Sequence, residues 1–360
     1  MIILYVLLSL SCLFVGFVNF SPEIGSNPSK KEQNTYNTYQ NYKDGEFINI
    51  EDTRRTTGQF SIVDFFKNDS NRLPKDLLED KKIDLKKFKS KDQISFSWLG
   101  HSSFLFNINE KLIMLDPILS DYASPIPIKR FKRFNTNTAL SIDELDSIDI
   151  VIFSHDHYDH LDYKTVKYLH NKVRKFVVPV GLGNHLRGWG VSSNSIIELN
   201  WEESFVVDEL EFVCLPSRHY SGRSLFNTNS TLWASWAILS KKGKIYFSGD
   251  SGYGLHFKEI GNNYGPFDVS LIDCGQYNNA WKHLHMFPEE CTMASIDLKS
   301  NYYMPIHWGA FTLSIHDWNE PIKQSVYYSE MYGQKILAPR IGEVVVLDSI
   351  NHQIIEWWNE

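Results

Sequence analysis

The chain has 360 residues, of which 42% are hydrophobic and 14% aromatic, enough to bury a large core. Its net charge of -7 argues against a nucleic-acid backbone as a partner. The four cysteines are widely spaced and form no CxxC pair, so they predict reduced core side chains rather than a disulfide framework or a thiolate zinc site. No flexible linker interrupts the chain after about residue 93, so we expect one large domain over residues 51–360.

Residues 1–20 carry no charged side chain and are mostly Ile, Leu, Val and Phe. About 20 apolar residues can cross a bilayer as a helix, so we expect a membrane anchor here. A removed signal peptide is the alternative, although the segment lacks the basic start that signals have. Lys30 and Lys31 follow the apolar run and no basic residue precedes it, which favours a cytoplasmic main domain attached to the membrane through this segment.

Residues 21–50 are rich in Asn, Ser, Tyr, Lys and Gln, which predicts an extended polar tether. Residues 51–93 are charged and patchily apolar, so one or two helices are expected over the domain. A lysine cluster in this part predicts a solvated face, with contact to lipid headgroups as the alternative. The cluster comprises Lys81, Lys82, Lys86, Lys87, Lys89 and Lys91.

Short alternating and apolar runs predict strands through the rest of the chain. The first three, at 94–99, 104–108 and 111–115, suggest an antiparallel meander. A helix capped by Asp162 follows, and the order becomes strand, helix, strand, helix. Between these parts, residues 129–134 interleave basic and aromatic side chains. This pattern suits either a groove for a phosphate-bearing ligand or a solvated loop.

The densest group of possible metal ligands directly follows residues 148–153, an apolar β-branched run typical of a buried strand. In an extended segment, residues two apart face the same way. We therefore expect His155 and His157 to face one ion, and Asp159 and His160 to reach a second after the chain turns. Neutral imidazole and carboxylate are the usual ligands of zinc-type ions, so the sequence predicts a metal site here.

Three further strand ends present residues of the same kind. His219 follows a strand at 210–215, Asp250 follows one at 244–247, and His307 ends another. Because all three occupy the same kind of position as the first cluster, we expect them to complete the metal site. His101 also lies at a strand end, where it could support the site, face a substrate or serve only the structure.

Together these residues resemble the metallo-β-lactamase superfamily, in the pattern His155-x-His157-x-Asp159-His160 followed by His219, Asp250 and His307. A longer set of segments, within roughly residues 45–345, is similar to the branch of N-acylphosphatidylethanolamine-hydrolysing phospholipase D. These segments include Trp98-Leu99-Gly100-His101-Ser102, Leu115-Asp116-Pro117, Gly249-Asp250-Ser251-Gly252-Tyr253 and Ile306-His307-Trp308-Gly309.

The resemblance implies an α/β fold, the αββα four-layer sandwich, with two zinc ions per chain at the edge of the sheets. One zinc ion would be bound by His155, His157 and His219, and Asp250 would bridge both ions. The second ion would be bound by Asp159, His160 and His307.

The activity that the resemblance implies is cleavage of a phosphodiester in N-acylphosphatidylethanolamine-type phospholipids. A hydroxide shared by the metals would attack phosphorus, oriented by Asp159 and Asp250, and His285 would protonate the leaving group. Leu284 stands where mammalian relatives carry glutamine, so a polar contact to the substrate is either missing or supplied by Gln276. The expected partners are phospholipid and membrane, with a homodimer possible.

Three other functions stay open at this point. A related hydrolase of another ester, such as a lactone or a small phosphodiester, would share every ligand and differ only in its pocket. A metal-binding scaffold without catalysis would usually have lost ligands, whereas all seven are present here. A redox enzyme could hold iron on the same residues.

Overall fold

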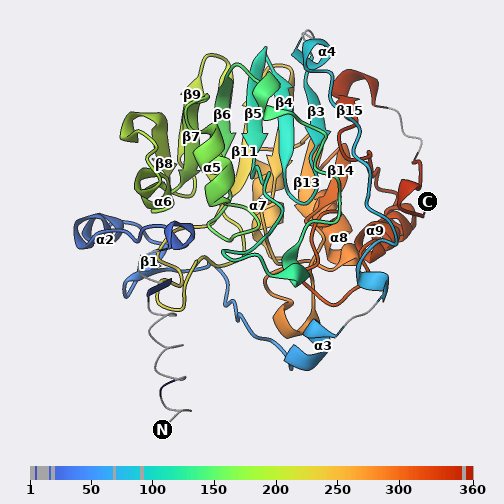
Figure 1. Ribbon diagram of the computed structural model, residues 1–360. Coiled ribbons are helices and arrows are strands. Elements are labelled where there is room, and N and C mark those ends of the chain that lie inside the picture. Colours follow the sequence, from blue (N-terminus) through green and yellow to red (C-terminus); the bar gives the residue numbers. More distant parts are fainter. Residues whose placement is uncertain are drawn as a thin grey trace.

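The computed structural model describes residues 5, 16–17, 21–67, 70–89, 93–350 and 354–359. Two large β-sheets lie face to face, and helices cover their outer faces (Figure 1). Every residue of β4 (Phe104–Ile108) and of β13 (Val269–Asp273) is buried, as expected for central strands covered on both sides. The four-layer αββα sandwich predicted from the resemblance is therefore confirmed.

The first sheet has seven strands in the order β15-β3-β4-β5-β6-β7-β8. Its β3-β4-β5 part is the predicted antiparallel meander, with Phe96 opposite Phe106. From β5 to β8 all neighbours are parallel, so these strands end at the same edge. The bounds not yet given are β15 (Val344–Val346), β3 (Ser95–Trp98), β5 (Lys111–Leu115), β6 (Ile148–Ile152), β7 (Val173–Pro179) and β8 (Ile196–Leu199).

The second sheet has six strands in the order β14-β13-β12-β11-β10-β9. Strands β9 to β12 form antiparallel pairs, whereas β12, β13 and β14 run parallel. The parallel strands again bring their carboxyl ends to one edge. The strands are β14 (Tyr302–Ile306), β12 (Gly243–Phe247), β11 (Ser235–Ser240), β10 (Leu210–Leu215) and β9 (Ser204–Val207).

The helices lie outside the two sheets (Figure 1). Helix α5 (Tyr163–Leu169) is capped by Asp162, whose carboxylate accepts from the backbone N–H groups of Lys164 and Thr165, so the predicted cap is confirmed. Helix α8 contacts both β13 and β14 of the second sheet. The others are α2 (Lys30–Tyr36), α3 (Ile62–Phe66), α4 (Leu85–Lys89), α6 (Gly183–Gly188), α7 (His256–Asn263), α8 (Pro288–Asp297) and α9 (Glu320–Tyr332).

Residues 21–50 differ from the polar tether that we expected. They contain α2 and a small hairpin of β1 (Tyr42–Lys43) and β2 (Glu46–Phe47). The side chains of Tyr36, Tyr42 and Phe47 join the hydrophobic core, and the rings of Tyr42 and Phe47 lie 4.8 Å apart. These aromatic side chains bury enough apolar area to offset the entropy lost when a polar segment becomes ordered.

The membrane anchor expected at the N-terminus is not supported. Among the helices that the structure describes, none is long and apolar enough to cross a bilayer. The longest of these, α9, has 13 residues, whereas a spanning helix needs about 20. Most of residues 1–20 lies outside the described residues. The expectation of a membrane location through this segment, with a cytoplasmic main domain, is corrected accordingly.

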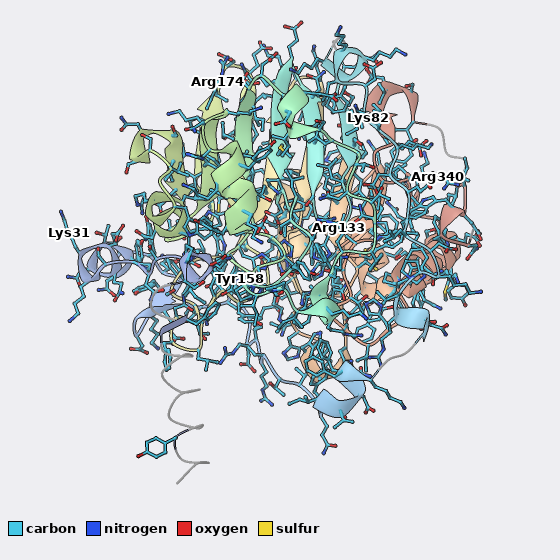
Figure 2. The ribbon with its side chains drawn as sticks, viewed as in Figure 1. Lys31, Lys82, Arg133, Tyr158, Arg174 and Arg340 are labelled. Carbon is cyan, nitrogen blue, oxygen red and sulfur yellow. The ribbon has the colours of Figure 1, made fainter. Side chains whose placement is uncertain are left out.

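Helix α4, which carries Lys86, Lys87 and Lys89 of the lysine cluster, lies at one end of the sheets, and α3 lies at the other end (Figure 1). Lys82, at the α4 end, forms an exposed ion pair of 2.6 Å with Glu144. Figure 2 shows Lys82 far from Tyr158, a side chain that lines the cavity described below. The position of Lys82, far from this cavity, favours the solvated face over the lipid contact.

Candidate metal centre

Loops that leave strand ends in both sheets bring the seven predicted ligands together. Four of them come from the loop after β6, and the other three follow β10, β12 and β14. These side chains fall into two groups. Within each group, the possible ligand atoms, nitrogen or oxygen, all lie within 4.8 Å of one another. One group comprises His155, His157, His219 and Asp250, and the other comprises Asp159, His160, His307 and, in addition, His101.

The first group has the dimensions of a tetrahedral site. The Nδ1 atom of His157 lies 2.9 Å from Nε2 of His155 and 3.2 Å from Nε2 of His219. Oδ2 of Asp250 lies 3.7 Å from each of the same Nε2 atoms. A tetrahedron with metal–nitrogen bonds of about 2.0 Å has edges of about 3.3 Å. These four atoms can therefore hold one metal ion.

Asp250 of the first group also lies close to two histidines of the second group. Oδ1 of Asp250 lies 3.1 Å from Nε2 of His160, and its Oδ2 lies 3.4 Å from Nε2 of His307. Oδ2 of Asp159 lies 3.5 Å and 3.1 Å from the same two histidine nitrogens. Asp250 thus stands between the two groups, which is the position that a bridging carboxylate requires.

The burial and charge of these side chains also fit metal cations. Nε2 of His160 and Oδ1 of Asp250 are buried and lie 3.1 Å apart, yet neither atom makes a well-aligned hydrogen bond among the described residues, an arrangement that costs free energy unless a ligand satisfies it. Burial keeps the pKa values of His155 and His219 well below their usual range, so both imidazoles are neutral, the form that binds metal. Burial alone would raise the pKa of Asp159, but nearby histidines lower this pKa well below its usual range.

Two carboxylates that the sequence analysis missed orient the histidines. Asp116 lies 2.7 Å from Nδ1 of His160 and also accepts the backbone N–H of Ser154. Asp273 lies 3.1 Å from Nδ1 of His307. Because each carboxylate holds Nδ1, the opposite Nε2 atom faces the group of ligands. The sequence feature that could have identified Asp116 is its position directly after the strand at 111–115. Asp273 ends β13, a strand that we did not predict from the sequence.

The side chain of His101 is fully buried and does not line the cavity over the ligands, so His101 supports the site and does not face a substrate. Its Nε2 atom lies 2.9 Å from Oδ2 of Asp159. Its backbone pairs with the neighbouring segment, since the N–H of His101 donates to Trp308 and the N–H of His307 donates to His101. His101 therefore fixes both a side chain and a backbone segment of the second group.

A cavity of about 450 Å³ opens over both groups. His285 lies on its wall, and Nδ1 of this side chain is 2.9 Å from Oδ2 of Asp273. The predicted proton donor is therefore placed beside the ligands, 4.0 Å from Oδ2 of Asp250. The remaining wall combines Asp159, Asp250 and His307 with Arg55, Ala123, Phe131, His157, Tyr158, Tyr220, Gly222, Gln276, Trp281, Leu284 and Leu313.

Gln276 does not supply the polar substrate contact that was one of our two alternatives. Its amide donates to the carbonyl oxygens of His307 and Phe311, and its Oε1 accepts the backbone N–H of Leu313. All these contacts lie within the protein, and only 4% of the residue is exposed. Gln276 therefore shapes the loop after His307, and the apolar side chain of Leu284 stays on the cavity wall.

The basic and aromatic stretch at 129–134 is divided between structure and cavity. Arg133 is buried, donates to the carbonyl oxygen of Ile118 at 2.7 Å, and lies over the ring of Phe311. Its guanidinium is therefore used within the fold. Phe131, in contrast, lines the cavity over the metal ligands. The stretch therefore contributes an aromatic side chain to the cavity wall, whereas a phosphate-binding groove was one of our two expectations.

Comparisons with known proteins bear on the family and the fold of this chain. A model of the beta-lactamase superfamily domain matches residues 112–308. An uncharacterised protein of Mycobacterium tuberculosis is 42% identical over 257 residues, which are 70% of this chain and 68% of that protein. N-acyl-phosphatidylethanolamine-hydrolyzing phospholipase D 1 of Caenorhabditis elegans is 34% identical over 238 residues, or 63% of this chain and 67% of that protein. The structure of Igni18, a metallo hydrolase of Ignicoccus hospitalis, has a TM-score of 0.52 at 20% identity, covering 71% of this chain and 98% of that one.

Proposed function

The chain belongs to the beta-lactamase superfamily and is a metal-dependent hydrolase, and we propose that it cleaves N-acylphosphatidylethanolamine-type phospholipids. The products are phosphatidic acid and an N-acylethanolamine, as in a phospholipase D reaction. The observation that carries this proposal is the placement of two ligand groups, joined by Asp250, under a cavity with an apolar wall. The name of the Caenorhabditis elegans relative supports the choice of substrate.

The residues present fit two divalent cations such as zinc. His155, His157 and His219 would hold one, Asp159, His160 and His307 would hold the other, and Asp250 would contact both. When bound, two such cations lower the pKa of a shared water and neutralise the charge that develops on phosphoryl oxygens.

The protein's own side chains then orient and protonate the substrate. Asp273 holds Nδ1 of His285, which lies on the wall of the cavity. In the proposed reaction the ring of His285 donates a proton to the leaving alkoxide of the N-acylethanolamine part, while the diacylglycerol part stays on the phosphate as phosphatidic acid. Asp159, held by His101, keeps its carboxylate directed at the ligand group. These contacts give the substrate phosphate a defined position before bond cleavage.

The cavity wall suits a lipid phosphate. Phe131, Trp281, Leu284 and Leu313 supply apolar surface for the start of the acyl chains. Arg55, on the same wall, supplies a cation for the phosphate. A lactone or a small phosphodiester would leave much of this apolar surface uncovered.

A comparison of substrates tests the proposal. Zinc-loaded protein is incubated with N-acylphosphatidylethanolamine, with bis-p-nitrophenyl phosphate and with an acyl-homoserine lactone, and products are identified by mass spectrometry. We expect phosphatidic acid and N-acylethanolamine in equal amounts, and no such products from the Asp159→Asn variant. His285→Gln should lower kcat by about 100-fold or more while its zinc content stays unchanged. Turnover of the soluble esters alone would overturn the lipid proposal and favour another ester.

A further inference from the structure

Exposed apolar side chains lie on two sides of the cavity over the metal centre. On one side, Ile62, Val63 and Phe66 of α3 are 68%, 79% and 57% exposed. On the other side, Leu225 and Phe226 are 76% and 79% exposed. Single exposed apolar residues are ordinary, but a group of them around a binding cavity marks an interaction surface.

Helix α3 is attached to the wall of the cavity. The ring of Phe60, just before the helix, lies 4.9 Å from that of Trp281, and the ring of Phe65 lies 6.1 Å from that of Phe131. Trp281 and Phe131 both line the cavity. The inward aromatic contacts thus position the helix, while its other apolar side chains remain exposed.

Hydrogen bonds to Asn227 fix the conformation of the loop that carries Leu225 and Phe226. The buried Oδ1 of Asn227 accepts the backbone N–H groups of Arg223 and Ser224, and also the hydroxyl of Ser224. Because these polar groups are satisfied inside the loop, the two apolar side chains at its tip are presented to solvent by a fixed backbone. This arrangement requires a reason, since exposing Leu and Phe together opposes the hydrophobic effect.

This loop also borders the metal cavity. Leu225 and Phe226 line a side cavity of about 390 Å³ together with Arg55 and Tyr220. Arg55 and Tyr220 line the metal cavity as well. The predicted metal ligand His219 also lines this side cavity, so the exposed loop tip borders the metal centre.

Exposed cationic side chains lie beside the part of the cavity wall that contains Trp281. The side chain of Arg54 is 74% exposed, its Nε lies 3.7 Å from Oδ2 of the exposed Asp52, and its backbone N–H donates to His283. Lys282 is exposed next to it, and its backbone N–H donates to Thr57. Apolar side chains mixed with exposed Arg and Lys complement the headgroup region of a bilayer, where acyl chains lie just beneath anionic phosphates.

We propose that Ile62, Val63, Phe66, Leu225, Phe226 and Arg54 form a docking face for the surface of a phospholipid bilayer. This proposal deepens the proposed function and rests on it, because docking would bring the lipid phosphate to the cavity without removing the acyl chains from the membrane. The face needs no membrane-spanning segment. Helix α3, which carries three of these residues, lies at the end of the molecule opposite to the lysine-rich α4 (Figure 1).

Vesicle sedimentation tests the docking face without requiring turnover. The full metal-loaded chain is mixed with vesicles of phosphatidylcholine, with and without phosphatidylglycerol, that contain no N-acylated lipid. Two double variants remove the apolar parts, Ile62→Ser with Val63→Ser, and Leu225→Ser with Phe226→Ser. The matched control, Tyr327→Ser with Met331→Ser, removes side chains of α9 that are 58% and 64% exposed.

We expect the wild-type chain to bind vesicles, more strongly with phosphatidylglycerol and less strongly at high salt. Each face variant should weaken partition by about tenfold or more, whereas the control should bind as the wild type does. Equal loss in the control, or no loss in either face variant, would overturn the proposal. Thermal melting and zinc content identify a variant that has unfolded.

The docking face and the proposed function fail in different ways. If the chain binds vesicles through these side chains but releases no N-acylethanolamine from any preparation, the docking face stands and the proposed function fails. If the chain cleaves N-acylphosphatidylethanolamine dispersed in detergent but does not bind vesicles, the proposed function stands and the docking face fails.

Discussion

Asp273 is the residue that connects the metal ligands to the proposed proton donor. Its two carboxylate oxygens contact different histidines, Oδ1 the ligand His307 at 3.1 Å and Oδ2 the donor His285 at 2.9 Å. We therefore predict that Asp273→Asn lowers zinc affinity by about 10-fold to 100-fold, because the amide orients the His307 ring less strongly. Competition with a zinc chelator measures the affinity, and steady-state kinetics at saturating zinc measures kcat.

A matched control is Asp208→Asn, which alters a carboxylate that is 68% exposed and pairs with Lys111. This variant should keep the zinc affinity and kcat of the wild type. If Asp273→Asn also kept both, Asp273 would not position these histidines. If kcat at saturating zinc fell while affinity did not, the role of Asp273 would be limited to His285.

At the residue scale, the ligands could be predicted because each one follows a strand that can be recognised locally. His155 and His307 come directly after apolar β-branched or aromatic runs, and their spacing is visible in the sequence. The supporting contacts could not be predicted in this way. Asp116 reaches His160 across 44 positions of the chain, and His101 reaches Asp159 across 58. Such contacts depend on how the strands align in space.

At the scale of elements, the start of α7 predicts a pH dependence of stability. His256 is buried there, and burial together with the nearby Arg218 lowers its pKa from 6.5 to about 3. Between these values the unfolded chain binds a proton that the folded chain does not, so stability falls as the pH falls below 6.5. The expected slope from this one group is about 1.4 kcal/mol per pH unit. We predict that His256→Gln removes this contribution.

Urea unfolding at pH 7 and pH 5 measures the effect as the change in the free energy of unfolding. The control is His170→Gln, at the end of α5, where the side chain is partly exposed. The control should lose as much stability between the two pH values as the wild type, whereas His256→Gln should lose less. An equal loss in His256→Gln would show that other groups dominate the acid response.

The meander and the strands before the ligands were predicted with nearly the bounds that the structure has. Strand β4, for example, spans the predicted 104–108. The structure of residues 21–50 was not predicted, because we gave more weight to their polar composition than to the three aromatic side chains that join the core. Whether Tyr36, Tyr42 and Phe47 are buried depends on the surface available beside them, and a local pattern does not contain that information. The proposed docking face also combines loops from distant parts of the chain.

At the scale of the whole molecule, the ligands join the two sheets. The loop after β6 of the seven-stranded sheet carries His155 and His157, whereas His219 and Asp250 follow strands of the six-stranded sheet. All four offer atoms within 4.8 Å of one another. A metal ion bound by them would therefore connect the two halves of the sandwich, and metal binding should stabilise the molecule as a unit.

We predict that removing the metal with a chelator lowers the melting temperature by several degrees, because a ligand at 100 times its dissociation constant contributes about 2.7 kcal/mol. Scanning calorimetry at increasing zinc concentration should show one transition that moves upward and stays cooperative, since both sheets share the ion. His157→Gln removes one of the four ligand atoms of the first group, so it should reduce the rise of the melting temperature with zinc concentration. Without zinc, this variant should melt near the wild-type temperature, because the His157 ring is only partly buried. Two separate transitions, or a melting temperature that does not change when the metal content falls, would show that the ion does not couple the sheets.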